Sequence, residues 1–185
     1  MINTNDLKNG ITIEYEGSIY VVLDTQHVKP GKGAAIVKAK LKNLRTSSII
    51  EQTFNAGVKV ATAHISKQQM EYLYNMNDTY YFMNMETYEQ LELSSDSVGD
   101  NKYYLKENLS VYITSYNGEI LGIDLPDKVE LKVVHTEPAV KGNTTQNALK
   151  DAEVETGLNV KVPLFIEEGE VIIISTSDGK YVSRA

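Results

Sequence analysis

Residues 111–125 read Val-Tyr-Ile-Thr-Ser-Tyr-Asn-Gly-Glu-Ile-Leu-Gly-Ile-Asp-Leu and carry the clearest local signal in the chain. Two runs rich in β-branched and aromatic residues flank Asn117-Gly118, a dipeptide that favours a type I′ turn because both residues tolerate positive φ. The pattern predicts a β-hairpin built from residues 111–116 and 119–125. Runs of the same kind recur throughout the sequence, which indicates an all-β protein.

Further strands are predicted on both sides of this hairpin. They cover residues 11–15, 18–26, 35–44, 49–54, 58–63, 70–75, 80–84, 91–93, 129–135, 160–166, 171–175 and 181–182. A short helix is predicted around residues 103–107. The polar stretch 138–157 has little periodicity, and a loop of that length is usually functional or mobile.

These strands fall into three groups, so we expect three small all-β modules: 1–63, 64–127 and 128–185. Evenly spaced short strands with turn signals suggest barrels or sandwiches. Modules of about 60 residues bury a limited share of their surface, so we expect them to pack on one another.

The composition excludes several kinds of site. The chain of 185 residues has no cysteine, which rules out disulfides, cysteine-bound zinc and a thiol nucleophile. Its three histidines are scattered without ligand-like spacing, so we expect no metal and no cofactor. No signal-peptide pattern opens the chain, and no apolar run could span a bilayer, so we expect a soluble, cytoplasmic protein with no membrane partner.

The net charge of −7 is distributed unevenly. Residues 1–63 carry +3, residues 64–127 carry −8 and residues 128–185 carry −2. Residues 25–48 contain six basic side chains and no acid. A basic face on an acidic body is an electrostatic footprint for RNA, and it is equally consistent with a solvated lysine-bearing face.

The basic side chains of residues 35–44 follow the period of a strand. Side chains alternate between the two faces of a strand, so Val37, Ala39 and Leu41 share one face. The opposite face carries a ladder of three lysines: Lys38, Lys40 and Lys42.

The segment Val28-Lys29-Pro30-Gly31-Lys32-Gly33-Ala34-Ala35 joins two predicted strands and forms a hairpin tip. Pro30 fixes its own φ, and Gly31 and Gly33 permit tight turns and close approach of the backbone to another surface. Lys32 has no carboxylate nearby in the sequence. It suits insertion into a narrow anionic channel or access by a modifying enzyme, or it is an ordinary exposed loop lysine.

Two separated groups of motifs resemble the bacterial elongation factor P family. The first is Lys29-Pro30-Gly31-Lys32-Gly33-Ala34 with Lys40-Leu41-Lys42-Asn43-Leu44. The second comprises Lys150-Asp151-Ala152, Gly157, residues 160–166, Gly169 and the ending Tyr181-Val182-Ser183-Arg184. Tyr88-Glu89-Gln90-Leu91 and Val129-Glu130-Leu131 fit between them, so the resemblance covers the whole chain.

The resemblance implies an N-terminal SH3-like (KOW-type) barrel followed by two OB-type barrels in an L-shaped chain. It implies a translation factor that binds the ribosome, both rRNA and ribosomal proteins, beside the peptidyl-tRNA and relieves stalls at consecutive prolines. Lys32 would reach toward the peptidyl-transferase centre and be a target of a lysine-modifying enzyme. The protein would act as a monomer and as an aid to ribosomal chemistry, without being an enzyme.

The same resemblance suggests which further residues make contacts. Lys38, Lys40, Lys42 and Arg45 would bind phosphates, with Lys29, Pro30, Gly31 and Gly33 shaping the tip. Contacts of the third module would involve Gly142, Asn143, Thr144, Tyr181 and Arg184. Many family members read Gly-Asp-Thr where this chain has Gly142-Asn143-Thr144, so a contact that needs a carboxylate there is in doubt.

Two other classes of function are alternatives to a translation factor. A general single-stranded RNA-binding protein would need basic, aromatic-rich grooves in the second and third modules, and the −8 charge of residues 64–127 counts against it. Tyrosines cluster there without accompanying lysines, which favours core and strand packing. A small enzyme is disfavoured because no nucleophile–base pair or metal-ligand set is present.

Overall fold

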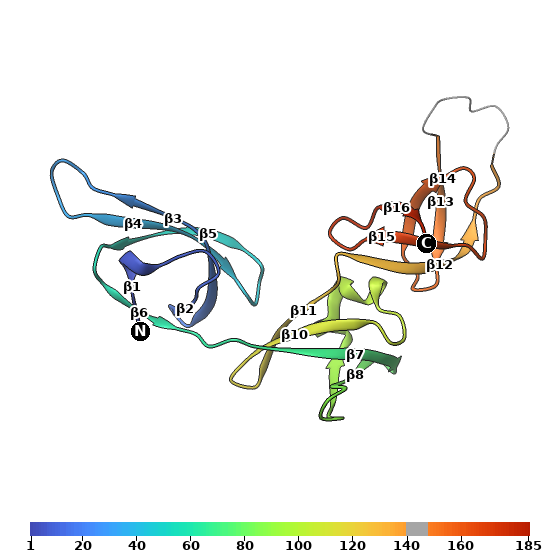
Figure 1. Cartoon of the computed structure of the whole chain (residues 1–185), viewed down its shortest axis with the longest axis horizontal. Coiled ribbons are helices and arrows are strands. Elements are labelled where there is room, and N and C mark those ends of the chain that lie inside the picture. Colours follow the sequence, from blue (N-terminus) through green and yellow to red (C-terminus); the bar gives the residue numbers. More distant parts are fainter. Residues whose placement is uncertain (140–147) are drawn as a thin grey trace. The chain divides into compact units, whose positions relative to one another are not determined.

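The computed structural model describes residues 1–139 and 148–185 and places their strands in three sheets (Figure 1). The chain divides into two compact units, Met1–Lys67 with Thr114–Gly122, and Gln68–Ile113 with Ile123–Ala185. The all-β prediction is confirmed, and the module boundaries near residues 63 and 127 stay predictions.

The first unit is built around a six-stranded sheet in the order β1-β6-β2-β3-β4-β5. Its elements are β1 (Ile2–Asn3), the 3-10 turn η1 (Thr4–Asp6), β2 (Thr12–Tyr15), β3 (Ser18–Val28), β4 (Ile36–Asn43), β5 (Ile49–Asn55) and β6 (Lys59–Thr62). The β3–β4 hairpin ends in a tip that projects from the sheet (Figure 1).

The core of this sheet is set by alternation along its strands. On β4, Val37, Ala39 and Leu41 are fully buried. Ala39 and Leu41 pack with inward-facing residues of the neighbouring elements, namely Leu7, Ile13, Val22, Phe54 and Val60. The intervening β4 residues consequently face outward, as the sequence predicts.

The second sheet has the order β11-β10-β7-β8-β9. Its strands are β7 (Ser66–Met76), β8 (Thr79–Met83), β9 (Gln90–Ser94), β10 (Ser110–Tyr116) and β11 (Glu119–Asp124). The turn between β10 and β11 has φ of 49° at Asn117 and 82° at Gly118. Both values are positive, as a type I′ turn requires, so the hairpin prediction is confirmed.

The helical segment lies earlier than predicted. The structure has α1 (Ser95–Val98) and the 3-10 helix η2 (Gly99–Tyr104), so the helix predicted around residues 103–107 overlaps the observed one only at residues 103–104. The Ser94 side chain caps the first turn by accepting a hydrogen bond from the Ser97 amide at 3.3 Å, and Val98 anchors that turn in the core.

The third sheet has the order β14-β13-β12-β15-β16. Its strands are β12 (Lys128–Thr136), β13 (Leu149–Val154), β14 (Asn159–Pro163), β15 (Val171–Ser175) and β16 (Tyr181–Arg184). β13 lies within the stretch 138–157 that the sequence predicts to be a loop, so that prediction is wrong for these six residues. Lys150, Ala152 and Val154 occupy its buried face, and Lys150 is only 7% exposed. Because a lysine and an alanine occupy two of the three core positions, the sequence of this strand does not show the usual alternation of apolar and polar residues.

The buried face of β4 yields a prediction about stability. Leu41→Ala should lower the free energy of unfolding by about 2–5 kcal/mol, because it removes a fully buried side chain and leaves a cavity. Lys40→Ala, one residue away on the exposed face, should change it by less than about 0.5 kcal/mol. Chemical denaturation of both variants checks this, and equal effects would contradict the assignment of the two faces.

Candidate nucleic-acid interface

The projecting tip of the β3–β4 hairpin consists of exposed residues. Lys29 through Ala34 are all exposed, and no carboxylate in residues 1–139 or 148–185 forms an ion pair with the Lys32 ammonium. The tip therefore presents an unpaired cation on a narrow loop.

The two tip glycines serve different purposes. Gly33 has φ of +112°, a conformation that L-residues with side chains rarely adopt. Gly31 lies outside the left-handed region, and a β-carbon there would meet nothing within 4 Å. The fold needs glycine at Gly33, whereas at Gly31 glycine only makes the tip slimmer beside Lys32.

The lysine ladder lies on β4 as predicted, with Lys38 and Lys40 exposed and Lys42 half-buried. The sheet register adds a feature that the sequence does not show. Lys40 lies opposite Asp24 of β3 and opposite Glu51 of β5. Directly paired residues share a face of the sheet, so two carboxylates flank the middle of the ladder and reduce its positive charge.

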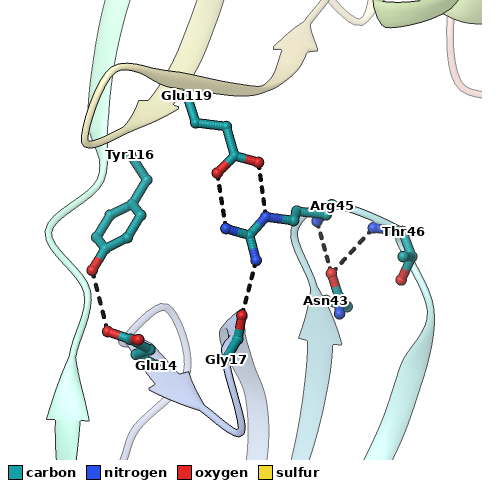
Figure 2. Close-up of polar contacts among 7 residues, drawn as sticks. All are labelled: Glu14, Gly17, Asn43, Arg45, Thr46, Tyr116 and Glu119. Carbon is teal, nitrogen blue, oxygen red and sulfur yellow. Dashed lines mark hydrogen bonds and ion pairs between the residues drawn. The ribbon is translucent and has the colours of Figure 1, made fainter.

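Arg45, predicted to bind phosphate, forms an ion pair inside the first unit (Figure 2). Its Nε and Nη2 donate to the two carboxylate oxygens of Glu119 at 2.9 and 2.8 Å, and its Nη1 donates to the Gly17 carbonyl at 3.1 Å. The Arg45 guanidinium lowers the pKa of Glu119, chiefly through these hydrogen bonds. The bidentate geometry fixes the direction of the pair as well as its distance.

The backbone around Arg45 is held by Asn43. Its Oδ1 accepts hydrogen bonds from the amides of Arg45 and Thr46 at 2.8 and 3.1 Å (Figure 2). The β10–β11 hairpin, which carries Glu119, makes a second contact with this sheet. The Tyr116 hydroxyl donates a hydrogen bond to Glu14 at 3.3 Å. The tip of that hairpin is thus bound at two points to the sheet that carries the ladder.

The residues predicted to make contacts from the third module are placed as follows. Arg184 forms an ion pair with Glu170 at 2.7 Å, and its guanidinium lies 4.9 Å from the centre of the Phe165 ring. Tyr181 is half-buried against the core of its sheet. Gly142, Asn143 and Thr144 lie outside the described residues.

The structure also brings together residues that the sequence analysis did not connect. A groove of about 810 Å³ in the second unit has three tyrosines and two lysines among its lining, namely Tyr72, Tyr74, Tyr80, Lys102 and Lys106. The lysines follow the tyrosines by more than twenty residues and reach them only through the fold. Glu107 and Glu155 also line this groove, so its net charge is close to neutral.

Those tyrosines differ in burial. Tyr72 is buried, its hydroxyl donates to Asn75 at 3.2 Å, and burial raises its pKa to about 12. Tyr74 is 46% exposed and stacks on Tyr81 with ring centres 4.7 Å apart. The expectation of core and strand packing is confirmed for both residues, since Tyr72 lies in the core and Tyr74 packs across the strands on Tyr81.

Neither a metal site nor a membrane-spanning helix stands out in the part of the chain that the structure describes. No group of three His, Cys, Asp or Glu side chains there could hold a metal ion. None of its helices is long and apolar enough to cross a membrane.

Comparison with known families gives three matches that follow one another along the chain. Residues 3–60 match the elongation factor P (EF-P) KOW-like domain, residues 65–123 its OB domain and residues 129–184 its C-terminal domain. The chain is similar to elongation factor P of Moorella thermoacetica, with 52% identity over 185 residues that cover 100% of both chains. The resemblance and the predicted domain types are confirmed.

Two solved structures share part of the fold. Translation initiation factor 5A from Methanococcus jannaschii covers 64% of this chain and 88% of its own, with a TM-score of 0.54 and 24% identity. A factor of the same family from Naegleria fowleri covers 67% and 96%, with a TM-score of 0.55 and 14% identity. At these identities the likeness concerns the fold alone.

The Arg45–Glu119 pair yields a prediction about pH. Arg45 lowers the pKa of Glu119 below the ordinary value of 4.5, so the pair stabilises the docked hairpin tip above that pH. This contribution should be lost only as the pH falls through the lowered pKa. The amide chemical shifts of residues 114–122 should report the change in an NMR titration.

Glu119→Gln should abolish this titration, because glutamine keeps the shape of the side chain without its charge. Glu130→Gln, at an exposed position on β12, should leave it unchanged. A titration of the hairpin tip that persists in Glu119→Gln would contradict the assignment.

Proposed function

We propose that this chain, which belongs to the elongation factor P family of translation factors, binds the ribosome beside the peptidyl-tRNA and promotes peptide-bond formation at consecutive prolines. In this proposal it is a cytoplasmic monomer and an accessory factor, and the ribosome performs the chemistry. Its partners are rRNA, ribosomal proteins and the peptidyl-tRNA, and Lys32 reaches toward the peptidyl-transferase centre.

The observation that carries the proposal is the unpaired Lys32 on the slim β3–β4 tip. A cation without a local carboxylate is available to an external anion, and RNA supplies phosphates. Gly31 supports this interpretation, because neither its backbone conformation nor its surroundings require glycine. A narrow tip is an advantage where the backbone must enter a confined site.

The mechanism rests on positioning. The ring of proline restricts the peptide chain and makes the prolyl amine a poorly placed nucleophile. A factor that holds the end of the peptidyl-tRNA can improve the alignment of the reacting groups, and alignment is worth up to several kcal/mol. Lys32 would provide that hold as a cation, and a lysine-modifying enzyme acting on it would extend its reach.

The ladder of Lys38, Lys40 and Lys42 would bind the RNA backbone and fix the orientation of the hairpin without reading bases. Arg45 would take part only after leaving Glu119, since both its Nε and its Nη2 donate to that carboxylate. Contacts from the third module through residues 142–144, Tyr181 and Arg184 remain part of the proposal. Arg184 would first have to leave Glu170.

One observation favours a second candidate, a protein that binds single-stranded RNA in general. The groove beside Tyr74 combines an exposed aromatic ring with Lys102 and Lys106, and bases stack on such rings. Binding to RNA oligomers as tight as binding to whole ribosomes would favour this candidate. The acidic charge of residues 64–127 favours the first one.

Substitutions of Lys32 test the first candidate. Lys32→Ala should reduce ribosome affinity modestly, since the ladder remains, while stimulation of proline–proline synthesis should fall to near background. Lys32→Arg keeps the charge but blocks lysine-specific extension, so it should fail nearly as badly. The assay is reconstituted translation with factor purified from its native host, comparing a message that encodes three consecutive prolines with one that encodes none.

Full activity of Lys32→Ala, or equal stimulation of both messages, would overturn the mechanism. The intact mass of the native protein adds an independent check. We expect added mass on the peptide that contains Lys32, and a mass equal to that of the sequence would leave unmodified Lys32 as the working group.

The ladder yields a separate prediction about salt. Lys40→Glu with Lys42→Glu should weaken ribosome binding and flatten the dependence of log K on log salt by about one to two units, because two phosphate contacts are lost. Lys8→Glu with Lys59→Glu changes the charge equally at exposed positions outside the ladder and should have a smaller effect. Matching salt dependences for the two double variants would show that the ladder is merely solvated.

A further inference from the structure

All three sheets contain the same six-residue hairpin loop. The loops comprise residues 43–48, 84–89 and 175–180. In each, the amide of the first residue donates to the carbonyl of the sixth at 2.8–2.9 Å, and the amide of the fifth donates to the carbonyl of the first at 2.7–2.9 Å. The fifth residue has positive φ in every case: 60° at Ser47, 59° at Tyr88 and 70° at Gly179.

In the loops of the first and second sheets, backbone hydrogen bonds and the asparagine at the first loop position fix the conformation. Asn84 Oδ1 accepts from the amides of Glu86 and Thr87 at 2.9 and 3.2 Å, as Asn43 does in the loop of the first sheet. The side chain at the fifth position has no part in this closure. A serine and a glycine suffice in the other two loops, and a bulky residue at positive φ is uncommon.

Tyr88 does not contribute visibly to the fold. Its side chain is 71% exposed, and it makes no hydrogen bond or ring contact with the residues that the structure describes. Met85, in the same loop, is 47% exposed. Two large apolar side chains therefore face solvent from the loop between β8 and β9.

The charge around this loop selects the kind of partner. Residues 68–101 contain seven acids and no Lys or Arg. Glu86, Glu89 and Glu92 are exposed in the loop and on the adjacent β9. RNA phosphates would be repelled here, whereas an arginine or lysine could stack on the Tyr88 ring and pair with a nearby carboxylate.

We propose that Tyr88 and Met85 form a docking surface for a basic segment of a ribosomal protein. The inference rests on the proposed function, because it assigns one of the ribosomal contacts of this chain. It divides the work between two surfaces of opposite charge, with the β4 ladder binding RNA and the Tyr88 loop binding protein. Aromatic side chains in such positions commonly supply a large share of the binding energy.

The first test removes the side chain at the fifth loop position. Tyr88→Gly in the full chain should leave the melting temperature unchanged or higher, because glycine suits positive φ. It should raise the Kd for ribosomes about five- to tenfold. Ser47→Gly, the matched change in the first sheet, should leave that Kd unchanged. Equal affinities of wild type and Tyr88→Gly would overturn the inference.

The second test identifies what the ring touches. A photoreactive p-benzoylphenylalanine at position 88 should cross-link to a ribosomal protein, within a peptide that carries Arg or Lys. Adducts with rRNA alone, or none on saturated ribosomes, would overturn the inference. If wild-type protein fails to bind ribosomes, the proposed function fails and this inference with it. If it binds and Tyr88→Gly binds equally well, only this inference fails.

Discussion

The alternation of side chains along β4 is the constraint on which the first sheet depends. Val37, Ala39 and Leu41 fill its core, so a slip of one residue would bury Lys38 and Lys40 and expose the apolar set. That penalty fixes the register of β3 against β4. The same register fixes the direction in which the tip projects, so one packing requirement places both the lysine ladder and Lys32.

Basic residues in this chain divide into those that hold the structure and those that face outward. Arg45 and Arg184 both form ion pairs with carboxylates, and in each case the planar guanidinium also meets a second partner, a carbonyl or an aromatic ring. Arginine suits such roles because its donors are arranged in a fixed fork. Lys32 and Lys38 are exposed and form no ion pair with the described residues, which leaves their charges to an external anion, whereas Lys40 faces Asp24 and Glu51 across the sheet.

The same six-residue loop occurs in all three sheets, and comparison of the three copies shows that Tyr88 is the unusual residue. The three six-residue loops share their hydrogen bonds and their positive φ at the fifth position, although their sequences differ. At Gly179 a β-carbon would lie 3.0 Å from the Tyr104 hydroxyl, so a side chain there would require Tyr104 to shift. The loop of the second sheet has no such restriction and carries a tyrosine. The comparison separates what the loop geometry requires from what this position adds.

Features that depend on near neighbours could be predicted from the amino-acid sequence. Alternation gave the ladder on β4, and Asn117-Gly118 gave the turn between β10 and β11. It failed at β13, where Lys150 occupies a core position and disguises the strand. The helical turns were predicted too late in the chain because the prediction did not use Ser94, whose side chain caps the first turn.

The tertiary structure alone decided the pairings between distant residues. Arg45 and Glu119 lie 74 positions apart, and the sequence around each residue does not indicate that they form a contact. Asp24 and Glu51 come to flank Lys40 only through the registers of β3 and β5. Lys102 and Lys106 reach the tyrosine groove in the same way. The alternation of residues along a strand specifies the face of the sheet on which a side chain lies. The charges that surround the side chain on that face depend on which strands the fold places beside its own.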